Sequence, residues 1–321
     1  MISQVRGKLA DNLSKSIPMS VDDKPTFARA HRDHPLYGLV GPLVAIHRGR
    51  EERMHGTAFL IAPGLAVTAA HVVIDYLEAF QKFNLSHGKG DHRGQLSFNM
   101  VIPLLRADGT HCPLRVIRTS FSLPGDFAIL HVDTPKDGDW SSLAPFPTLQ
   151  LAPPNEQSHI QAFGFPSGKV TKGADGIANL HTWPRLSVGS VLEIHDSKRD
   201  GVTLNFPCFR TNARFDGGMS GAPIINNAGN VCGMVCKSYD LLSDEEPISY
   251  GATLWPIAGI KLAHVPPIGR DTGRVGDLLV SRQIASVDYM RLTGGIDASG
   301  RFFVGFEPSN GNEALLPKPG S

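Results

Sequence analysis

Short apolar runs separated by glycine and proline are the feature that most constrains the fold of this chain. The 321 residues include 34 glycines and 24 prolines, which are scattered rather than clustered. Both residue types interrupt regular elements and form tight turns, so the pattern favours many short strands over long helices. No long helical periodicity lies between the runs, which argues against a parallel α/β sheet.

The predicted strands form two sets of six, separated by a segment rich in proline and serine at 137–154 that suits a linker. The sequence therefore predicts an all-β protein of two antiparallel six-stranded β-barrels with short N-terminal and C-terminal extensions. The expected domains are an extension at 1–35, a first barrel at 36–148, a second barrel at 149–262 and an extension at 263–321. The predicted strands are 39–46, 56–62, 65–68, 96–105, 114–118 and 127–132, then 159–164, 185–194, 203–211, 222–226, 231–236 and 250–255.

The two extensions give weaker patterns. A short amphipathic helix is expected at 5–13, and the stretch 257–262 is expected to start a short closing helix. A further helix is expected within 275–292 and a strand at 301–306, and 308–321 reads as a loose tail.

Charge and hydropathy exclude two classes of partner. The formal net charge is +1, so no strong field recruits nucleic acid or an anionic membrane. No apolar run approaches the roughly 18 residues of a membrane span. The N-terminal residues carry charges where a signal peptide has its apolar stretch, so a cytoplasmic protein is expected unless a leader has been lost.

The cysteines and histidines predict no cofactor and no metal. The four cysteines are too few for a disulfide framework and should pack as reduced thiols; they are Cys112, Cys208, Cys232 and Cys236. Cys232 and Cys236 lie four apart in a predicted strand, so they should share a face. His87, Asp91 and His92 fall in a loop without metal-ligand spacing.

The first motif with chemical meaning is Val67-Thr68-Ala69-Ala70-His71-Val72. A strand ends on small residues and places a histidine at its tip. A general base must be rigidly held yet open to a cleft, and small neighbours leave that room. His71 is therefore a candidate general base, although a histidine after a strand is also common as a structural residue.

The second motif is Gly125-Asp126-Phe127-Ala128-Ile129-Leu130, in which an aspartate opens an apolar strand. A buried carboxylate is unfavourable there unless its charge is met, and an imidazole N–H would meet it. The alternative is an aspartate that only caps the turn at Gly125.

The third motif is Phe215-Asp216-Gly217-Gly218-Met219-Ser220-Gly221-Ala222-Pro223. Glycines let the backbone turn sharply and direct successive N–H groups inward. The turn Gly218, Met219 and Ser220 is the candidate oxyanion hole, with the N–H groups of Gly218 and Ser220 as donors.

The three motifs together are more specific than any one of them. A serine hydroxyl is a poor nucleophile at neutral pH and needs an adjacent base, and the base needs a partner that fixes its tautomer. The chain supplies one candidate for each role. They are His71 as base, Asp126 as its partner and Ser220 as nucleophile.

These motifs resemble the trypsin/chymotrypsin-like serine protease superfamily, and most closely its bacterial HtrA-type (high-temperature-requirement) branch, over residues 36–262. His71 follows the Thr-Ala-Ala-His pattern, Asp126 the Asp-x-Ala-(Ile/Leu)-Leu pattern and Ser220 the Gly-x-Ser-Gly-x-Pro pattern. Residues 162–168 resemble the Gly-x-Pro-x-Gly turn that opens the second barrel. The resemblance implies a chymotrypsin-like double barrel and a serine endopeptidase that hydrolyses peptide bonds through an acyl-enzyme.

Two departures from the family pattern stand out. Secreted members have an aspartate just before the serine that pairs with a newly cut N-terminus, and here that position is Met219. Activation by that route is therefore not expected. No PDZ-type domain is expected in the residues that follow 262, because they are too few and too rich in glycine and proline.

By the resemblance, Arg214, Cys236, Lys237 and Ser238 would line the primary substrate pocket. Arg214 either favours an acidic substrate side chain or points to solvent, and both alternatives stay open. The extended edge at 236–238 would pair with the substrate backbone as an added strand. The expected partner is a protein or peptide substrate. A latent protease switched on by an activating protein partner, and a non-catalytic barrel scaffold that binds peptide, remain alternatives.

Overall fold

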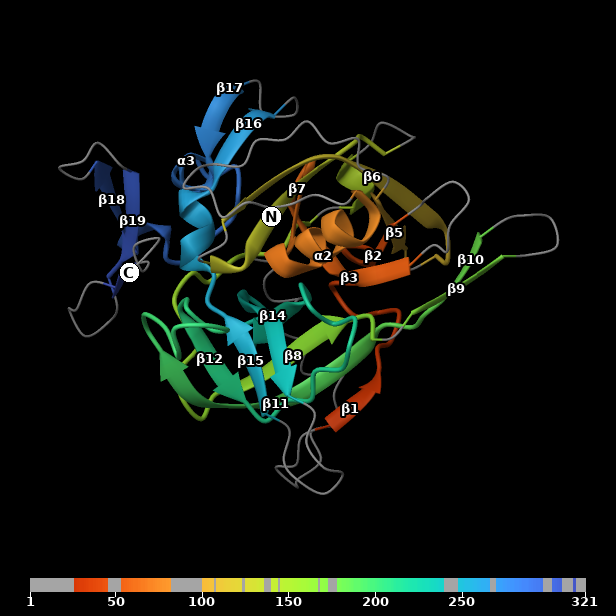
Figure 1. Ribbon diagram of the computed structural model, residues 1–321, viewed down its shortest axis with the longest axis horizontal. Helices are drawn as coiled ribbons and strands as arrows, with labels where there is room; N and C mark the ends of the chain where they lie inside the picture. The colour runs from red at the N-terminus through yellow and green to blue at the C-terminus, as the bar shows by residue number, and fades with distance from the viewer. Residues whose placement is uncertain are drawn as a thin grey trace.

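The computed structural model describes residues 26–45, 53–81, 100–106, 108–122, 125–135, 140–143, 145–166, 168–172, 178–239, 248–265, 270–296, 302–307 and 314–315. Two antiparallel barrels lie one above the other in Figure 1. The all-β, double-barrel fold predicted from the strand pattern is confirmed.

The first barrel closes in the order β2-β3-β4-β7-β6-β5. Its central strands β4 and β7 are buried along their whole length, which matches their continuous apolar runs. β6 instead alternates exposed and buried residues over its first half, as a strand with one solvent face does. The strands are β2 (Val40–Ala45), β3 (Arg53–Ala62), β4 (Leu65–Ala69), β5 (Met100–Leu105), β6 (His111–Ser122) and β7 (Phe127–Val132).

The second barrel runs β11-β12-β15-β14-β13-β8 and closes because β8 also pairs with β11. A separate cluster of buried side chains lies within it and includes Phe209, Ile224 and Val235. Its strands are β8 (His159–Gly164), β11 (Arg185–His195), β12 (Cys208–Thr211), β13 (Pro223–Asn226), β14 (Val231–Tyr239) and β15 (Ile248–Ala252).

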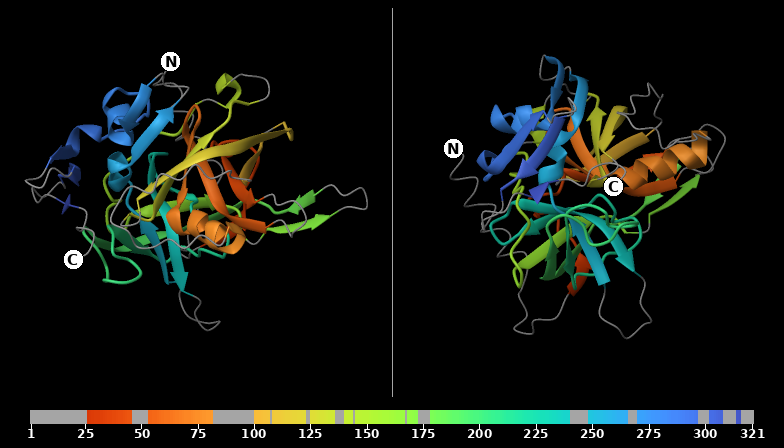
Figure 2. Two further views of the ribbon diagram at one scale, coloured as in Figure 1. Left: turned by 45° about the horizontal axis from the view of Figure 1, so that its top comes forward. Right: turned by 60° about the vertical axis from the view of Figure 1, so that its left-hand side comes forward.

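Three elements in and around the barrels were not expected from the sequence. β1 (Thr26–Arg29) adds an edge strand to β11 of the second barrel, where a plain extension was predicted. Helix α2 (Ala70–Gln81) follows β4 directly. The hairpin of β9 (Lys169–Lys172) and β10 (Ala178–His181) projects from the molecule, as Figure 2 shows. The predicted helix at 5–13 lies outside the described residues.

The C-terminal extension differs from its prediction. The single helix expected within 275–292 is only α3 (Val275–Val280), because Arg282 takes a left-handed φ of 59° that no helix continues through. The closing helix is the 3-10 turn Trp255–Gly259, followed by the hairpin β16 (Lys261–Val265) and β17 (Arg270–Arg274). β18 (Leu292–Ile296), β19 (Phe302–Phe306) and β20 (Ala314–Leu315) form a small sheet, so part of the predicted tail is a strand. Two further 3-10 turns are Trp140–Leu143 and Tyr289–Arg291.

The four cysteines are buried and free of disulfides, as predicted. Cys232 and Cys236 do not share a face, however. Cys232 packs inside the second barrel, whereas Cys236 packs in the larger cluster that includes the first barrel. Two register shifts on β14, at its pairings with β13 and β15, change the face of the strand between these residues. Among the described residues, no helix is both long and apolar enough to cross a bilayer.

Two buried histidines should make the free energy of unfolding depend on pH. Burial lowers the pKa of His34 and of His131 to about 4, and the charge of Arg118 adds to the effect at His131. The unfolded chain binds these protons near the ordinary pKa of about 6.5, so it takes up more protons than the folded chain below that pH. Stability should therefore be full above pH 6.5 and fall as the pH drops towards 4. Each histidine should contribute a loss of about 2–3 kcal/mol by pH 4.5.

Urea unfolding at pH 7.5 and pH 4.5 measures this loss. His131→Leu should lose about 2–3 kcal/mol less between the two pH values than the wild type. The matched control is His111→Leu, because His111 is exposed on the same strand pair. If the wild type and His131→Leu lost the same free energy of unfolding between pH 7.5 and pH 4.5, His131 would not be a source of the acid sensitivity.

Candidate active site

His71 and Asp126 meet in the first barrel. His71 lies in the first turn of α2, just after β4, and Asp126 immediately precedes β7, the neighbour of β4. The His71 Nδ1 atom is 2.9 Å from Asp126 Oδ2 and 3.1 Å from Oδ1. The Asp126 side chain is 13% exposed and the His71 side chain 38%, so the carboxylate is inside while the ring edge reaches solvent. The geometry suits a histidine whose Nδ1–H donates to the carboxylate.

Asp126 also holds the start of helix α2. Its carbonyl oxygen accepts the Ala70 N–H at 2.9 Å, and its Oδ1 accepts the His71 N–H at 3.0 Å. Two N–H groups that a helix leaves unpaired at its N-terminus are thereby satisfied by a residue 55 positions away. Asp126 itself has a φ of 51°, a left-handed conformation that aspartate tolerates better than most residues. One residue thus fixes both the ring and the backbone of His71.

The charges around His71 raise its pKa. Burial acts to lower it, but the hydrogen bond and negative charge of Asp126, together with the charge of Asp75, outweigh burial. Lys237 opposes them from the second barrel. The net pKa lies above the ordinary 6.5, so the imidazole is a stronger base than a free histidine.

The turn that carries Ser220 belongs to the second barrel but packs on the first. A Cβ built on Gly56 of β3 would lie 2.8 Å from the Ser220 carbonyl oxygen and 2.8 Å from Cγ2 of Val72. Ser220 and the residue next to His71 therefore flank the same glycine. Between these described residues, no hydrogen bond joins the His71 ring to the Ser220 hydroxyl. Such bonds are often long in ligand-free sites.

Thr57 on β3 joins the two barrels at this turn. Its N–H donates to the Ser220 carbonyl at 2.8 Å, and its hydroxyl donates to the Gly218 carbonyl at 2.9 Å. The same hydroxyl accepts the Phe165 N–H at 3.1 Å, at the turn after β8. Thr57 is fully buried, so these bonds are shielded from water. Sequence reasoning missed Thr57, because a threonine within an apolar strand carries no distinguishing pattern.

The turn directs two N–H groups away from internal partners. Gly218 has a φ of 95°, which glycine adopts freely. The Met219 N–H donates to the Asp216 carbonyl at 3.0 Å, so this group holds the turn together. Within the described part of the chain, the N–H groups of Gly218 and Ser220 have no hydrogen-bond acceptor. They are the two donors that remain available to a ligand.

Gly221 is a point where the turn tolerates no side chain. Its φ is 88°, and a Cβ there would overlap the Thr57 carbonyl oxygen and the Thr68 hydroxyl. Both of those atoms are on backbone or buried strands and cannot move aside. We expect Gly221→Ala to lower the free energy of unfolding by about 3 kcal/mol or more.

The matched control for that substitution is Gly217→Ala in the same turn. A Cβ at Gly217 would meet no atom within 4 Å. Urea unfolding should show Gly217→Ala within about 1 kcal/mol of the wild type. Equal effects of the two substitutions would contradict the close packing of Gly221 on the first barrel.

Arg214, one of the residues predicted for the substrate pocket, is engaged elsewhere. Its Nε lies 2.6 Å from Asp216 Oδ1 and its Nη2 3.2 Å from Oδ2. The guanidinium also lies over the ring of Phe27 on β1, 5.1 Å from the centroid. Arg214 is therefore neutralised by a neighbour in the same turn.

The other three pocket candidates lie together on β14. Cys236 is buried, and its thiol donates to the Tyr250 carbonyl at 3.2 Å. Lys237 is exposed and Ser238 half-buried. Lys237 and Ser238 pair with β15 on one edge, and Cys236 lies at the register shift before them. On the other edge, β13 pairs with β14 only as far as Met234. Within the described residues, the second edge of β14 beyond that point pairs with no strand.

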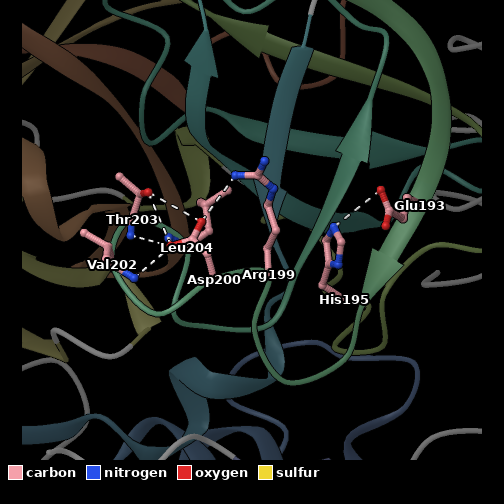
Figure 3. Close-up of polar contacts among 7 residues, drawn as sticks. All are labelled: Glu193, His195, Arg199, Asp200, Val202, Thr203 and Leu204. Atoms are coloured by element: carbon pink, nitrogen blue, oxygen red, sulfur yellow. Dashed lines mark hydrogen bonds and ion pairs between the residues drawn. The ribbon is translucent and has the colours of Figure 1, made fainter.

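A loop after β11 packs beside this part of the second barrel. Asp200 Oδ1 accepts N–H groups from Val202, Thr203 and Leu204 at 2.7–3.2 Å, and these bonds lower its pKa to about 2. Figure 3 shows this carboxylate closing the loop, with Arg199 beside it. The Arg199 guanidinium lies 5.0 Å from the ring of Tyr250, the cross-strand partner of Lys237.

The predicted loop residues His87, Asp91 and His92 lie outside the described residues. Within the described ranges, no group of three or more histidine, cysteine, aspartate or glutamate side chains is arranged to hold a metal ion.

Several solved structures resemble this chain at low identity. The active form of the Rv3671c protease from M. tuberculosis is 19% identical, with 70% of this chain and 79% of that chain covered and a TM-score of 0.42. Deg5 is 13% identical, with coverages of 77% and 89% and a TM-score of 0.42. The HtrA-type protease AlgW with a decapeptide is 15% identical, with coverages of 82% and 68% and a TM-score of 0.42.

No curated protein matches the sequence. The family model of the trypsin-like peptidase domain matches residues 56–234. That stretch begins in β3 and ends in β14, and it includes His71, Asp126 and Ser220. This chain therefore belongs to the trypsin-like peptidase domain family, as its three motifs predict.

Proposed function

We propose that this protein is a serine endopeptidase in which Ser220 is the nucleophile, His71 the general base and Asp126 the residue that orients the base. One observation carries the proposal. The Asp126 carboxylate, on a side chain only 13% exposed, binds both the ring and the backbone of His71, beside a turn that holds Ser220 against the same barrel. The family match supports peptidase chemistry in general.

The Asp126–His71 contact sets the tautomer of the base. With its Nδ1–H donated to the carboxylate, a neutral imidazole leaves Nε2 without a proton. Nε2 would then accept the Ser220 hydroxyl proton while the oxygen attacks the carbonyl carbon of the substrate. The negative charge of Asp126 would stabilise the imidazolium that forms.

The remaining steps follow from the available donors. The N–H groups of Gly218 and Ser220 would bind the oxyanion of the tetrahedral intermediate, a contribution of roughly 2.7–4 kcal/mol per donor. His71 would return its proton to the leaving amine, which gives an acyl-enzyme on Ser220. Water deprotonated by His71 would then release the acyl group by the same route.

Three of the four cysteines are unsuited to replace the serine. Burial raises the pKa of Cys208 and of Cys232 to about 12, and it raises that of Cys236 well above its ordinary value, with the Asp126 charge adding to the effect. Only the thiolate is strongly nucleophilic. These three thiols stay protonated at neutral pH.

The edge of β14 that pairs with no strand among the described residues supports cleavage within a chain rather than at its end. An extended substrate could pair with the backbone of Cys236 to Ser238, and such pairing continues in both directions along a peptide. Lys237 and Ser238 are the two side chains there with exposed surface.

The pH dependence of kcat/KM should report the pKa of His71. Only the neutral imidazole can accept a proton, so the rate rises with pH and its inflection lies above 6.5. Asp75→Asn should shift the inflection to lower pH, because it removes a negative charge that raises this pKa. Lys237→Met should shift it to higher pH for the opposite reason. Shifts of the same sign in both variants would contradict the role of His71 as base.

Labelling with a fluorophosphonate probe tests the proposal. Such probes react with a serine only when a base activates it. At neutral pH we expect one adduct per chain, located on Ser220, and release of peptides from casein. A folded protein that forms no adduct and releases no peptide would favour a non-catalytic scaffold. Ser220→Thr offers a matched variant that keeps a hydroxyl but adds a methyl group in a tight turn, and it should label slowly.

A further inference from the structure

The N-terminal strand β1 contacts the turn that carries Ser220 through one aromatic ring. Phe27 packs against the buried cluster of the second barrel, which includes Phe215 and Met219 from that turn. Two guanidinium groups also lie over its ring, those of Arg185 at 5.8 Å and Arg214 at 5.1 Å from the centroid. A strand with only four paired residues thereby gains a specific contact to the candidate site.

From Phe27 the contacts lead into the turn. Arg214 forms a bidentate ion pair with the Asp216 carboxylate. The Asp216 carbonyl accepts the Met219 N–H. Met219 lies between Gly218 and Ser220, whose N–H groups are the available donors. Any motion of Asp216 would therefore tilt the peptide units that carry those donors.

We propose that Phe27 is a positioning residue for the Gly218–Ser220 turn and that it acts through Arg214 and Asp216. The inference rests on the proposed function, since it assigns the turn to the oxyanion. It also gives β1 a role in supporting the turn. Met219 stands where secreted members of the superfamily have the aspartate that pairs with a newly cut N-terminus, and here β1 would reach the same turn by another route.

Exposure explains why the pair needs the ring. The Arg214 side chain is 60% exposed and the Asp216 side chain 27%. Exposed ion pairs of this kind contribute little by themselves, because water and side-chain entropy compete with them. A ring over one face of the guanidinium excludes water from that face and restricts its rotamers. Without Phe27 the pair loses this support, and the turn samples other arrangements.

Three single substitutions in the full chain test this role. Phe27→Ala removes the ring, Phe27→Trp keeps a ring, and Arg214→Ala breaks the contact from the other end without touching β1. Arg29→Ala is the matched control. Arg29 is on the same strand and also makes a cation–π contact, to Trp183 at 3.7 Å, but it has no part in the Arg214 pair.

Hydrogen–deuterium exchange of the Met219 amide gives a readout that needs no catalysis. We expect exchange to be about tenfold faster in Phe27→Ala and in Arg214→Ala, and unchanged in Arg29→Ala. The double variant Phe27→Ala/Arg214→Ala should exchange no faster than either single variant, because both remove the same support. An unchanged Met219 amide in Phe27→Ala, or fully additive effects, would overturn the proposal.

Kinetics give the second readout. In Phe27→Ala, kcat should fall about tenfold with KM within about twofold, and the inhibition constant of a peptide boronic acid should rise by the same factor as kcat falls. Phe27→Trp should restore kcat to within about threefold. The His71 inflection in the pH profile should not move. A parallel fall of kcat in Arg29→Ala would indicate a merely structural role and overturn the inference. If the wild type itself cleaves nothing, the proposed function fails while the exchange result still decides the role of Phe27.

Discussion

Ser220→Ala should lower kcat by roughly 10⁵–10⁶-fold and leave the fold intact. The hydroxyl oxygen is the atom that would form the acyl bond, so the substitution removes the proposed nucleophile. The carbonyl of residue 220 binds Thr57 through the backbone, and this bond survives the substitution. Peptide release from casein and a thermal melt measure the two effects.

The control for this substitution is Ser197→Ala. Ser197 is exposed in the loop after β11. Its variant should match the wild type in both rate and melting temperature. If Ser220→Ala retained more than about a hundredth of the activity, the nucleophile would be a different group.

Asp126→Asn should lower kcat by about 10⁴-fold with little loss of stability. Asparagine tolerates the left-handed φ of this position and can still accept the His71 N–H. Its amide N–H₂ group, however, would face Nδ1 and force the ring proton onto Nε2, where it blocks the base. The lost charge would also lower the pKa of His71. Kinetics across pH 5 to 9 and a thermal melt are the measurements.

Two further variants, Asp126→Ala and Asp133→Asn, serve as comparisons for Asp126→Asn. Asp126→Ala also removes the carboxylate that accepts the His71 N–H, so it should destabilise by about 1 kcal/mol more than Asp126→Asn. Asp133 holds Arg115 on the surface, and Asp133→Asn should keep wild-type kcat. An Asp126→Asn enzyme within tenfold of the wild type would refute the orienting role.

The barrels could be predicted because their strands are local patterns. Continuous apolar runs such as those of β4 and β7, bounded by glycine and proline, identify buried strands without knowledge of their partners. The three motifs were equally local. The roles of His71, Asp126 and Ser220 remain predictions, and the structure adds the distances that make them testable.

The elements that were missed depend on distant residues. The first turn of helix α2 includes Val72 and Val73, which favour strands, and its first N–H groups are satisfied by Asp126, which precedes β7. β1 pairs with β11, and its side chains Phe27 and Arg29 contact Arg214 and Trp183, all more than 150 residues away in sequence. The two faces of Cys232 and Cys236 followed from bulges that no spacing rule reveals. Thr57 carries no signal at all outside the folded protein.

Mass spectrometry of an acid-quenched reaction tests the central claim most directly. A peptide ester mixed with the protein and quenched within milliseconds should add one acyl group to the fragment that contains Ser220, and this species should be absent from Ser220→Ala and from His71→Ala. Hydrolysis of the ester without any covalent species, or an acyl group on another residue, would contradict the proposed roles of Asp126, His71 and Ser220.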